Sequence, residues 1–292
     1  MNATASNTVN LKNFSVSLCL NLNITIIMVI ESLISTKYLL KKPYLVIVHG
    51  VLGTLLAAVI SALLNQNGLF FVFLIVLSLL PATINNLKYE ERKKEYDYFW
   101  DYLYGLNFVY RHYNIIIYYL SIIFAISFTT AFLYILLPSE ISSKIFSNQI
   151  ATIAQITGSF SSKEIFSKIL INNLIVMCLC FIFSLFYSTG AIFLISWNAS
   201  VMGVAVGQGA KEFLGFISVP LVLLSYLPHG FFEFLGYVFA GIAGGILSVA
   251  VTRHRESRKH RLFVLKDSLI LFLVGVLFIF FGAVIETLII IG

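Results

Sequence analysis

Apolar runs long enough to cross a membrane recur along almost the whole chain. Each holds about 20 residues, the length that an α-helix needs to span the hydrocarbon core of a bilayer. Charged residues make up only 11% of the chain and hydrophobic residues 59%, whereas about a quarter of the residues of a soluble domain are charged. The sequence therefore predicts an all-α fold, a polytopic transmembrane helical bundle.

About eight runs qualify as spans. The first contains Asn21, Asn23 and Glu31, and the sixth is interrupted by Pro220, so seven spans are the alternative. The expected spans are residues 14–36, 44–64, 68–86, 115–137, 169–196, 209–227, 230–251 and 268–291.

The positions of lysine and arginine predict the orientation, because cytoplasmic loops keep an excess of these residues. Most of the 19 basic residues fall in inner loops if the N-terminus lies outside. With eight spans the C-terminus then also lies outside, and the expected location is the cell membrane. Membrane lipids are expected partners, because the inner loop after the seventh span is strongly basic and faces anionic headgroups. Orientation accounts for this basicity, so nucleic-acid binding is not expected. The basic residues of the loop are Arg253, Arg255, Arg258, Lys259 and Arg261.

Three segments between the spans are not simple loops. Residues 88–114 place aromatic residues at helical spacing and predict an amphipathic helix at the cytoplasmic interface, with a partner-docking helix as the alternative. Residues 138–168 predict an amphipathic helix on the outer surface, either a lid over the bundle or a partner site. The glycine-rich residues 197–211 predict an inner turn, with a re-entrant segment as the alternative.

The segment 227–248 carries the most specific polar pattern. His229 and Glu233 are four positions apart, so their side chains share one face of a helix. A charged side chain at the centre of a spanning helix costs about 2.5–3.5 kcal/mol to insert, which favours a position facing protein or water. Beyond them, small residues at every fourth position predict a seam for close helix packing. These small residues are Gly236, Ala240, Gly244 and Ser248.

The predicted topology brings further polar residues to the same depth. Asn172 and Asn173 begin a span that enters from outside, as do His229 and Glu233. Glu286 lies far along a helix that leaves the cytoplasm and reaches the outer half of the membrane. We expect these residues to converge near the outer face, either as a polar pocket or as a structural network that ties helices together.

Nothing in the sequence nominates a catalytic nucleophile. A histidine beside carboxyl groups can pass protons, but the sequence holds no metal-ligand spacing and none of the motifs of P-loop ATPases, serine hydrolases or zinc proteases. Cys19, Cys178 and Cys180 all fall in predicted spans, where a free cysteine behaves as a small hydrophobe. We expect a protein that is not an enzyme and has no metal or cofactor.

The pattern Pro228-His229-Gly230-x-x-Glu233, followed by a helix rich in glycine and alanine, resembles the stage II sporulation protein M family of integral membrane proteins. The resemblance covers about residues 115–292. Residues 1–87 form an N-terminal transmembrane region of unassigned family, and 88–114 separate it from the family-like domain. The supporting matches are Asn172 and Asn173 in a long apolar helix, Asn198 with Gly203 in a small-residue stretch, and Glu286 in the last span.

This resemblance implies a non-enzymatic component that anchors or organises partner proteins in the membrane. Bacterial relatives organise the wall-degrading complex that drives membrane movement during engulfment. The implied partners are membrane or cell-surface proteins, or further copies of the chain. The competing class is a membrane carrier for a small solute, a lipid or a proton that uses the polar pocket near the outer face.

Overall fold

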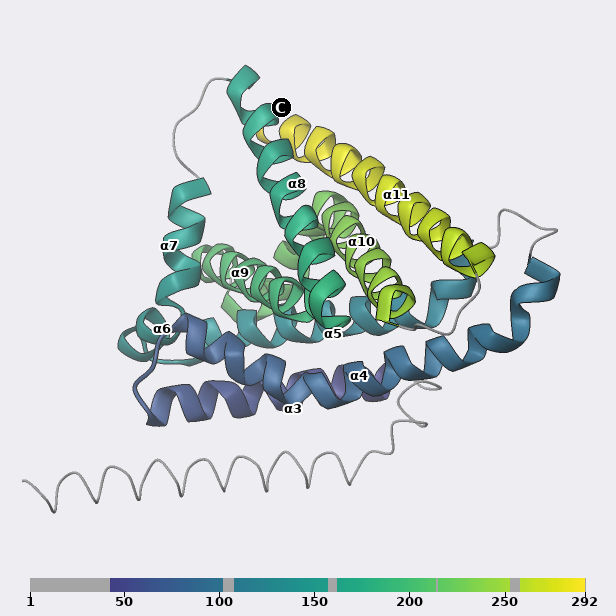
Figure 1. Cartoon of the computed structure of the whole chain (residues 1–292). Coiled ribbons are helices and arrows are strands. Elements are labelled where there is room, and N and C mark those ends of the chain that lie inside the picture. The colour runs from purple at the N-terminus through teal and green to yellow at the C-terminus, as the bar shows by residue number, and fades with distance from the viewer. Residues whose placement is uncertain (1–42, 102–107, 157–161, 214, 253–257, 292) are drawn as a thin grey trace, which may run out of the picture.

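The computed structural model describes residues 43–101, 108–156, 162–213, 215–252 and 258–291. Within these ranges every regular element is a helix, which confirms the all-α fold (Figure 1). The elements are α3 (Pro43–Leu63), α4 (Gly68–Asp101), α5 (Phe108–Leu136), α6 (Ser139–Ile145), α7 (Ser147–Ile156), α8 (Ser162–Tyr187), α9 (Ala191–Glu212), the short 3-10 helix η1 (Gly215–Ser218), α10 (Val219–Thr252) and α11 (Arg258–Ile291).

Seven of the described helices are long and apolar enough to cross a membrane: α3, α4, α5, α8, α9, α10 and α11. The polytopic helical bundle is thereby confirmed. The predicted first span, residues 14–36, lies outside the described residues.

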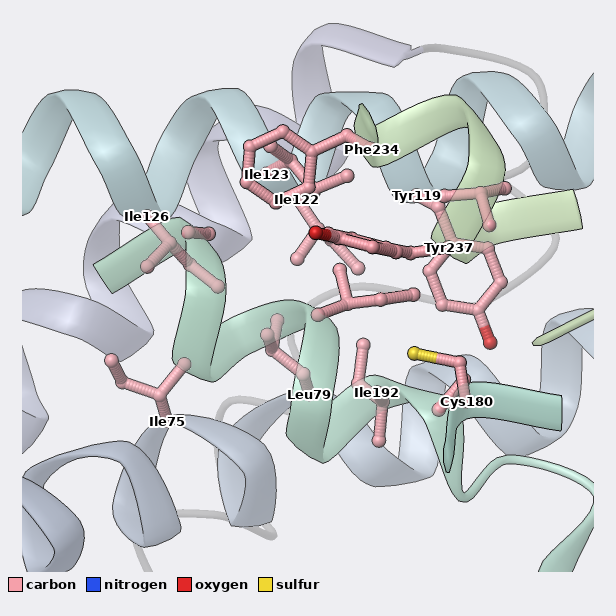
Figure 2. Close-up of a cluster of buried hydrophobic side chains, with 14 of the residues drawn as sticks. Ile75, Leu79, Tyr119, Ile122, Ile123, Ile126, Cys180, Ile192, Phe234 and Tyr237 are labelled. Carbon is pink, nitrogen blue, oxygen red and sulfur yellow. The ribbon is translucent and has the colours of Figure 1, made fainter. Parts of the chain in front are cut away.

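Two helices form the centre of the bundle. In the most apolar stretch of 18 residues of each helix, 72% is buried in α5 and in α10, but only 28% in α8 and 33% in α11. α5 packs on α3 and α9, and α10 packs on α8, α9 and α11. Figure 2 shows the core between them, where Tyr119 of α5, Ile192 of α9 and Phe234 of α10 lie among other apolar side chains.

Residues 197–211 are helical, which corrects the predicted inner turn and its re-entrant alternative. They form the greater part of α9, and their small residues bring α9 against α5. A Cβ on Gly203 would lie 2.6 Å from the carbonyl oxygen of Ser127. The Ser127 hydroxyl donates to the carbonyl oxygen of Ala199 at 2.9 Å. Glycines that would end a helix in water therefore serve close helix packing here.

The predicted span 169–196 is also corrected, because the chain turns after Tyr187 and starts α9 at Ala191. Ser188 has a positive φ of 45°, which residues other than glycine rarely adopt. Gly190 packs against the carbonyl oxygen of Phe183, where a side chain has no room. The turn was missed because it is short and interrupts an almost continuous apolar run.

The predicted spans 209–227 and 230–251 are wrong as separate helices. η1 is followed by a single helix, α10, of 34 residues that contains Pro228. Neighbouring groups in a membrane bundle can satisfy the backbone that a proline frees, so the proline does not end the helix. Residues 164–291 still contain four spanning helices, as predicted, but with different boundaries.

The first part of the predicted interfacial helix at 88–114 is not a separate helix but the end of α4. α4 runs on from the membrane span to Asp101, with Pro81 inside it. Residues 102–107 lie outside the described residues, and α5 begins at Phe108. The apolar run and the charged run thus share one helix, and Pro81, which lies within the apolar run, does not end it.

The predicted outer helix at 138–168 is divided into α6, α7 and the start of α8. α7 is fixed to the bundle by Gln149, whose amide nitrogen donates to the Gly68 carbonyl oxygen at 3.3 Å and the Ser200 hydroxyl at 3.1 Å. Ile145 and Phe146 are fully buried beside it. The location of these helices on the outer side stays a prediction.

The boundaries of α9 also move Lys211 from a predicted inner loop to the last turn of a spanning helix. We predict that Tyr187 and Phe213, both highly exposed at 74% and 75%, lie on opposite sides of the membrane. In a chain whose native cysteines are replaced by serine, an impermeant maleimide applied to intact cells should label Phe213→Cys. Tyr187→Cys should react only after permeabilisation. Labelling of both in intact cells would show that α9 does not cross.

The α5–α9 contact predicts a packing penalty at Gly203. Gly203→Ala should lower the free energy of unfolding by about 1–3 kcal/mol, the usual cost of overpacking, measured by reversible unfolding in detergent. Gly230→Ala is the matched control, since its Cβ would lie 3.5 Å from the Met202 sulfur, an ordinary contact. Equal stability of the two variants would contradict the close approach of α9 to α5.

Candidate functional site

Three helices bring polar side chains together inside the bundle. The Asn173 amide nitrogen of α8 donates to Oε1 of Glu233 on α10 at 2.5 Å. The Glu286 side chain of α11 lies beside the Glu233 carboxyl group, since Gly282, one turn before Glu286, packs against Cγ of Glu233. We call Asn173, Glu233, Glu286 and the adjoining Tyr237 the polar junction, because it joins α8, α10 and α11.

Tyr237 completes the junction and was missed by the sequence analysis. Its hydroxyl donates to Oδ1 of Asn173 at 2.8 Å, and the Asn172 amide nitrogen donates to the same oxygen at 3.3 Å. Both ends of the Asn173 amide are therefore occupied, which sets its orientation. The available signal was spacing, since Tyr237 lies four positions after Glu233 and therefore on the same helix face.

His229 lies one turn before Glu233, as predicted, and is close enough to Glu286 for electrostatic interaction. Its ring lies 5.7 Å from that of Tyr226, measured between centroids. Its Nδ1 atom is buried and has no hydrogen-bond partner among the described residues. His229 therefore borders the polar junction without being tied into its hydrogen bonds.

Glycines let the two glutamate-bearing helices come close enough for this contact. A Cβ on Gly236 of α10 would lie 3.0 Å from the carbonyl oxygen of Gly275 on α11. Further along α11, a Cβ on Gly282 would lie 2.9 Å from Cγ of Glu233. The carboxyl groups meet because these positions have no side chain.

The predicted small-residue seam of α10 faces two helices. Gly236 faces α11, while Gly244 lies against the Phe181 carbonyl oxygen of α8 and leaves no room for a side chain. Ser248 meets Ser188 beyond the end of α8, with the hydroxyl oxygens 3.3 Å apart. Ala240 between them is fully buried. The seam is thus internal to the protein.

The other predicted motif residues lie elsewhere. Pro228 is exposed on α10, and Gly230 is buried against Met202 of α9. Asn198 donates to the Leu194 carbonyl oxygen of its own helix at 2.8 Å, so it is not part of the junction. Gly203 serves the α5–α9 contact described above. In the predicted basic loop, Arg253 and Arg255 lie outside the described residues, and Arg258, Lys259 and Arg261 form the start of α11.

A second ionisable pair, not anticipated from the sequence, lies toward the other end of α11. Nε2 of His112 on α5 is 3.5 Å from Oδ2 of Asp267, and both side chains are buried. Asp267 and Glu286 are 19 positions apart, which corresponds to about 28 Å along a helix. The bundle therefore contains ionisable contacts near both ends of its last helix.

The chemistry available at the junction is hydrogen bonding and proton exchange. Two carboxyl groups, an amide, a phenol and a nearby imidazole meet there, and in the described ranges neither glutamate forms an ion pair with lysine or arginine. Over the same ranges no three metal-binding side chains cluster, at the junction or elsewhere.

Fold and site together define a multi-pass helical membrane protein with a polar junction inside its bundle. A family model described as Stage II sporulation protein M matches residues 116–289. The chain belongs to this family, which confirms the resemblance drawn from its motifs. Comparisons with curated proteins and with solved structures found no match.

The geometry predicts coupling between Tyr237 and Asn173. In a double-mutant cycle of Tyr237→Phe and Asn173→Leu, we expect a coupling energy of about 0.6 kcal/mol and at most about 1.7, the range found for hydrogen bonds between membrane helices. Reversible unfolding in detergent measures it.

Tyr118→Phe supplies the control for this cycle. It removes a comparable contact of 2.9 Å with Thr83, between α4 and α5. Its effect should add to that of Asn173→Leu, because the two sites share no partner. If the Tyr237 and Asn173 changes were equally additive, the hydrogen bond between them would be ruled out.

Proposed function

We propose that the protein is a non-enzymatic membrane component that positions partner proteins in the cell membrane. Membership of the stage II sporulation protein M family supports this proposal, because bacterial relatives act as membrane anchors and organisers. Membership of the family does not by itself imply a role in sporulation. We therefore describe the partners by the part of the bundle that they would contact. The structural support for this proposal is one exposed residue of α8.

That residue is Asn172. It lies within the span 164–187 and is exposed, next to the exposed Ile171 and three positions before the exposed Ile175. Its amide nitrogen donates to Asn173, and no hydrogen bond from the described residues reaches its side-chain oxygen. Lipid tails offer an amide no hydrogen bond, whereas a neighbouring helix does. An exposed amide at this depth therefore favours a partner helix against α8.

The packing of α8 suits such a role. Only 28% of its most apolar 18-residue stretch is buried, so most of its surface faces away from the bundle. The face that is buried is held to α10 by the Asn173–Glu233 hydrogen bond and by Gly244. A partner on the outer face of α8 would therefore be held in a defined orientation to the whole bundle.

Asn172→Leu tests the proposal in membranes of the native host. The substitution keeps the side-chain size and removes the amide, so we expect at least a several-fold loss of proteins that copurify with the wild-type chain after mild crosslinking. Ile175→Leu, on the same exposed side of α8, is the matched control and should retain them. Unchanged copurification in Asn172→Leu would contradict a partner contact at this amide.

The same preparation separates the organiser from a carrier. Glu233→Gln should leave copurification unchanged, because Glu233 lies inside the bundle. Solute uptake into reconstituted vesicles that is abolished by Glu233→Gln would favour the carrier instead.

A further inference from the structure

The Glu233 and Glu286 side chains are neighbours on α10 and α11, because Gly282, four positions before Glu286 on the same helix face, packs against Cγ of Glu233. An ionised carboxylate only accepts hydrogen bonds, so two carboxyl groups can be hydrogen-bonded to each other only if one of them carries a proton. The two groups come from different helices, α10 and α11, and Gly282 is the position that allows them to meet. A proton shared between the two carboxyl groups would therefore join the two helices.

The surroundings of the pair supply hydrogen bonds but no compensating cation. α8 contributes the neutral amide of Asn173, which donates to Glu233, and more deeply the thiol of Cys180. α10 contributes Tyr237, whose hydroxyl is already directed to Asn173. Two ionised carboxylates in contact, without a lysine or arginine partner among the described residues, would be costly inside a membrane.

His229 is the ionisable neighbour on the other side. It interacts with Glu286, and its Nδ1 atom is buried without a hydrogen-bond partner in the described structure. Tyr226 lies beside it, within range of Glu286 and of Glu212 on α9. An imidazole nitrogen left unpaired next to a carboxyl pair is suited to exchange a proton with it.

We propose that Glu233 and Glu286 form an intramembrane proton-binding site, which holds one proton between the two carboxyl groups at neutral pH. Binding turns two mutually repelling carboxylates into a hydrogen-bonded pair with a single negative charge. The proton is taken from water directly or through His229 and returns there on release, so no other reactant is needed. The proton then acts as a ligand that fastens α10 to α11.

Infrared spectroscopy of the full-length protein in lipid vesicles tests this site. The wild-type protein should show the C=O stretch of a protonated carboxyl group at neutral pH, with the small shift expected on transfer to D₂O. Glu233→Gln and Glu286→Gln should each abolish that band, because a glutamine cannot carry the shared proton. Glu140→Gln, which changes an exposed carboxyl group on α6, is the control and should leave the band intact.

Asp267→Asn distinguishes this site from the His112 pair and should also leave the band unchanged. Absence of a protonated carboxyl in the wild type at neutral pH would overturn the proposal, as would a band that survives in both glutamine variants. If the glutamine variants do not fold, the wild-type spectrum and Asp267→Asn decide: a band lost in Asp267→Asn overturns the proposal, and a band retained there supports it.

Stability against pH gives a second readout. A proton held only by the folded state stabilises the fold at low pH, and that contribution is lost as the pH rises and the proton leaves. The wild-type melting temperature should therefore fall on raising the pH above neutral, and the fall should be reduced in Glu233→Gln. An equal fall in both proteins would contradict a folded-state proton on this pair.

Discussion

The hydrogen bond from Asn173 to Glu233 is the contact on which the arrangement of α8, α10 and α11 depends. A carboxyl group on a spanning helix has no water to solvate it, so protein groups have to satisfy it. Glu233 meets this demand with an amide from α8 and a second carboxyl group from α11. Once those groups are required at one point, the three helices have to cross there, and Tyr237 fixes the amide that completes the contact.

Small residues make the same contact sterically feasible. Gly236 and Gly275 bring α10 and α11 to backbone contact, and Gly244 does so for α10 and α8 at a deeper level. α5 and α9 repeat the arrangement around Gly203. In a lipid environment, where apolar surface gains nothing by leaving lipid for protein, this close packing and the hydrogen bonds it permits supply the association energy. Polar residues and glycines are thus two parts of one packing scheme, and they leave α8 and α11 with broad outward faces for lipid or a partner.

Much of the fold could be predicted from the sequence, and the predictions that were wrong have identifiable physical causes. Hydropathy predicted the helical bundle. The charge of Glu233 in an apolar helix and the predicted depth of Glu286 in the last span marked two residues that the structure places beside each other. Helix boundaries failed at Pro228 and at the glycines of residues 197–211, because these residues act as breakers in water and as packing positions in a membrane. Tyr237 was missed because a tyrosine in an apolar helix is ordinary, and its role depends on Asn173, 64 positions away. The contact of His112 with Asp267 was missed for the same reason, since nothing local marks either residue as the partner of the other.

Crosslinking in native membranes tests the central claim, that α8 and α10 meet through Asn173 and Glu233. In a chain without its native cysteines, Asn173→Cys and Glu233→Cys should be joined by a short bifunctional methanethiosulfonate. Ser188→Cys with Ser248→Cys, whose parent hydroxyl oxygens are 3.3 Å apart at the other end of the same helix pair, is the reference. We predict that both pairs crosslink, whereas Ile171→Cys with Glu233→Cys does not, because Ile171 is exposed on the outer face of α8. A reference pair that reacts while the pair at 173 and 233 does not would contradict the polar junction.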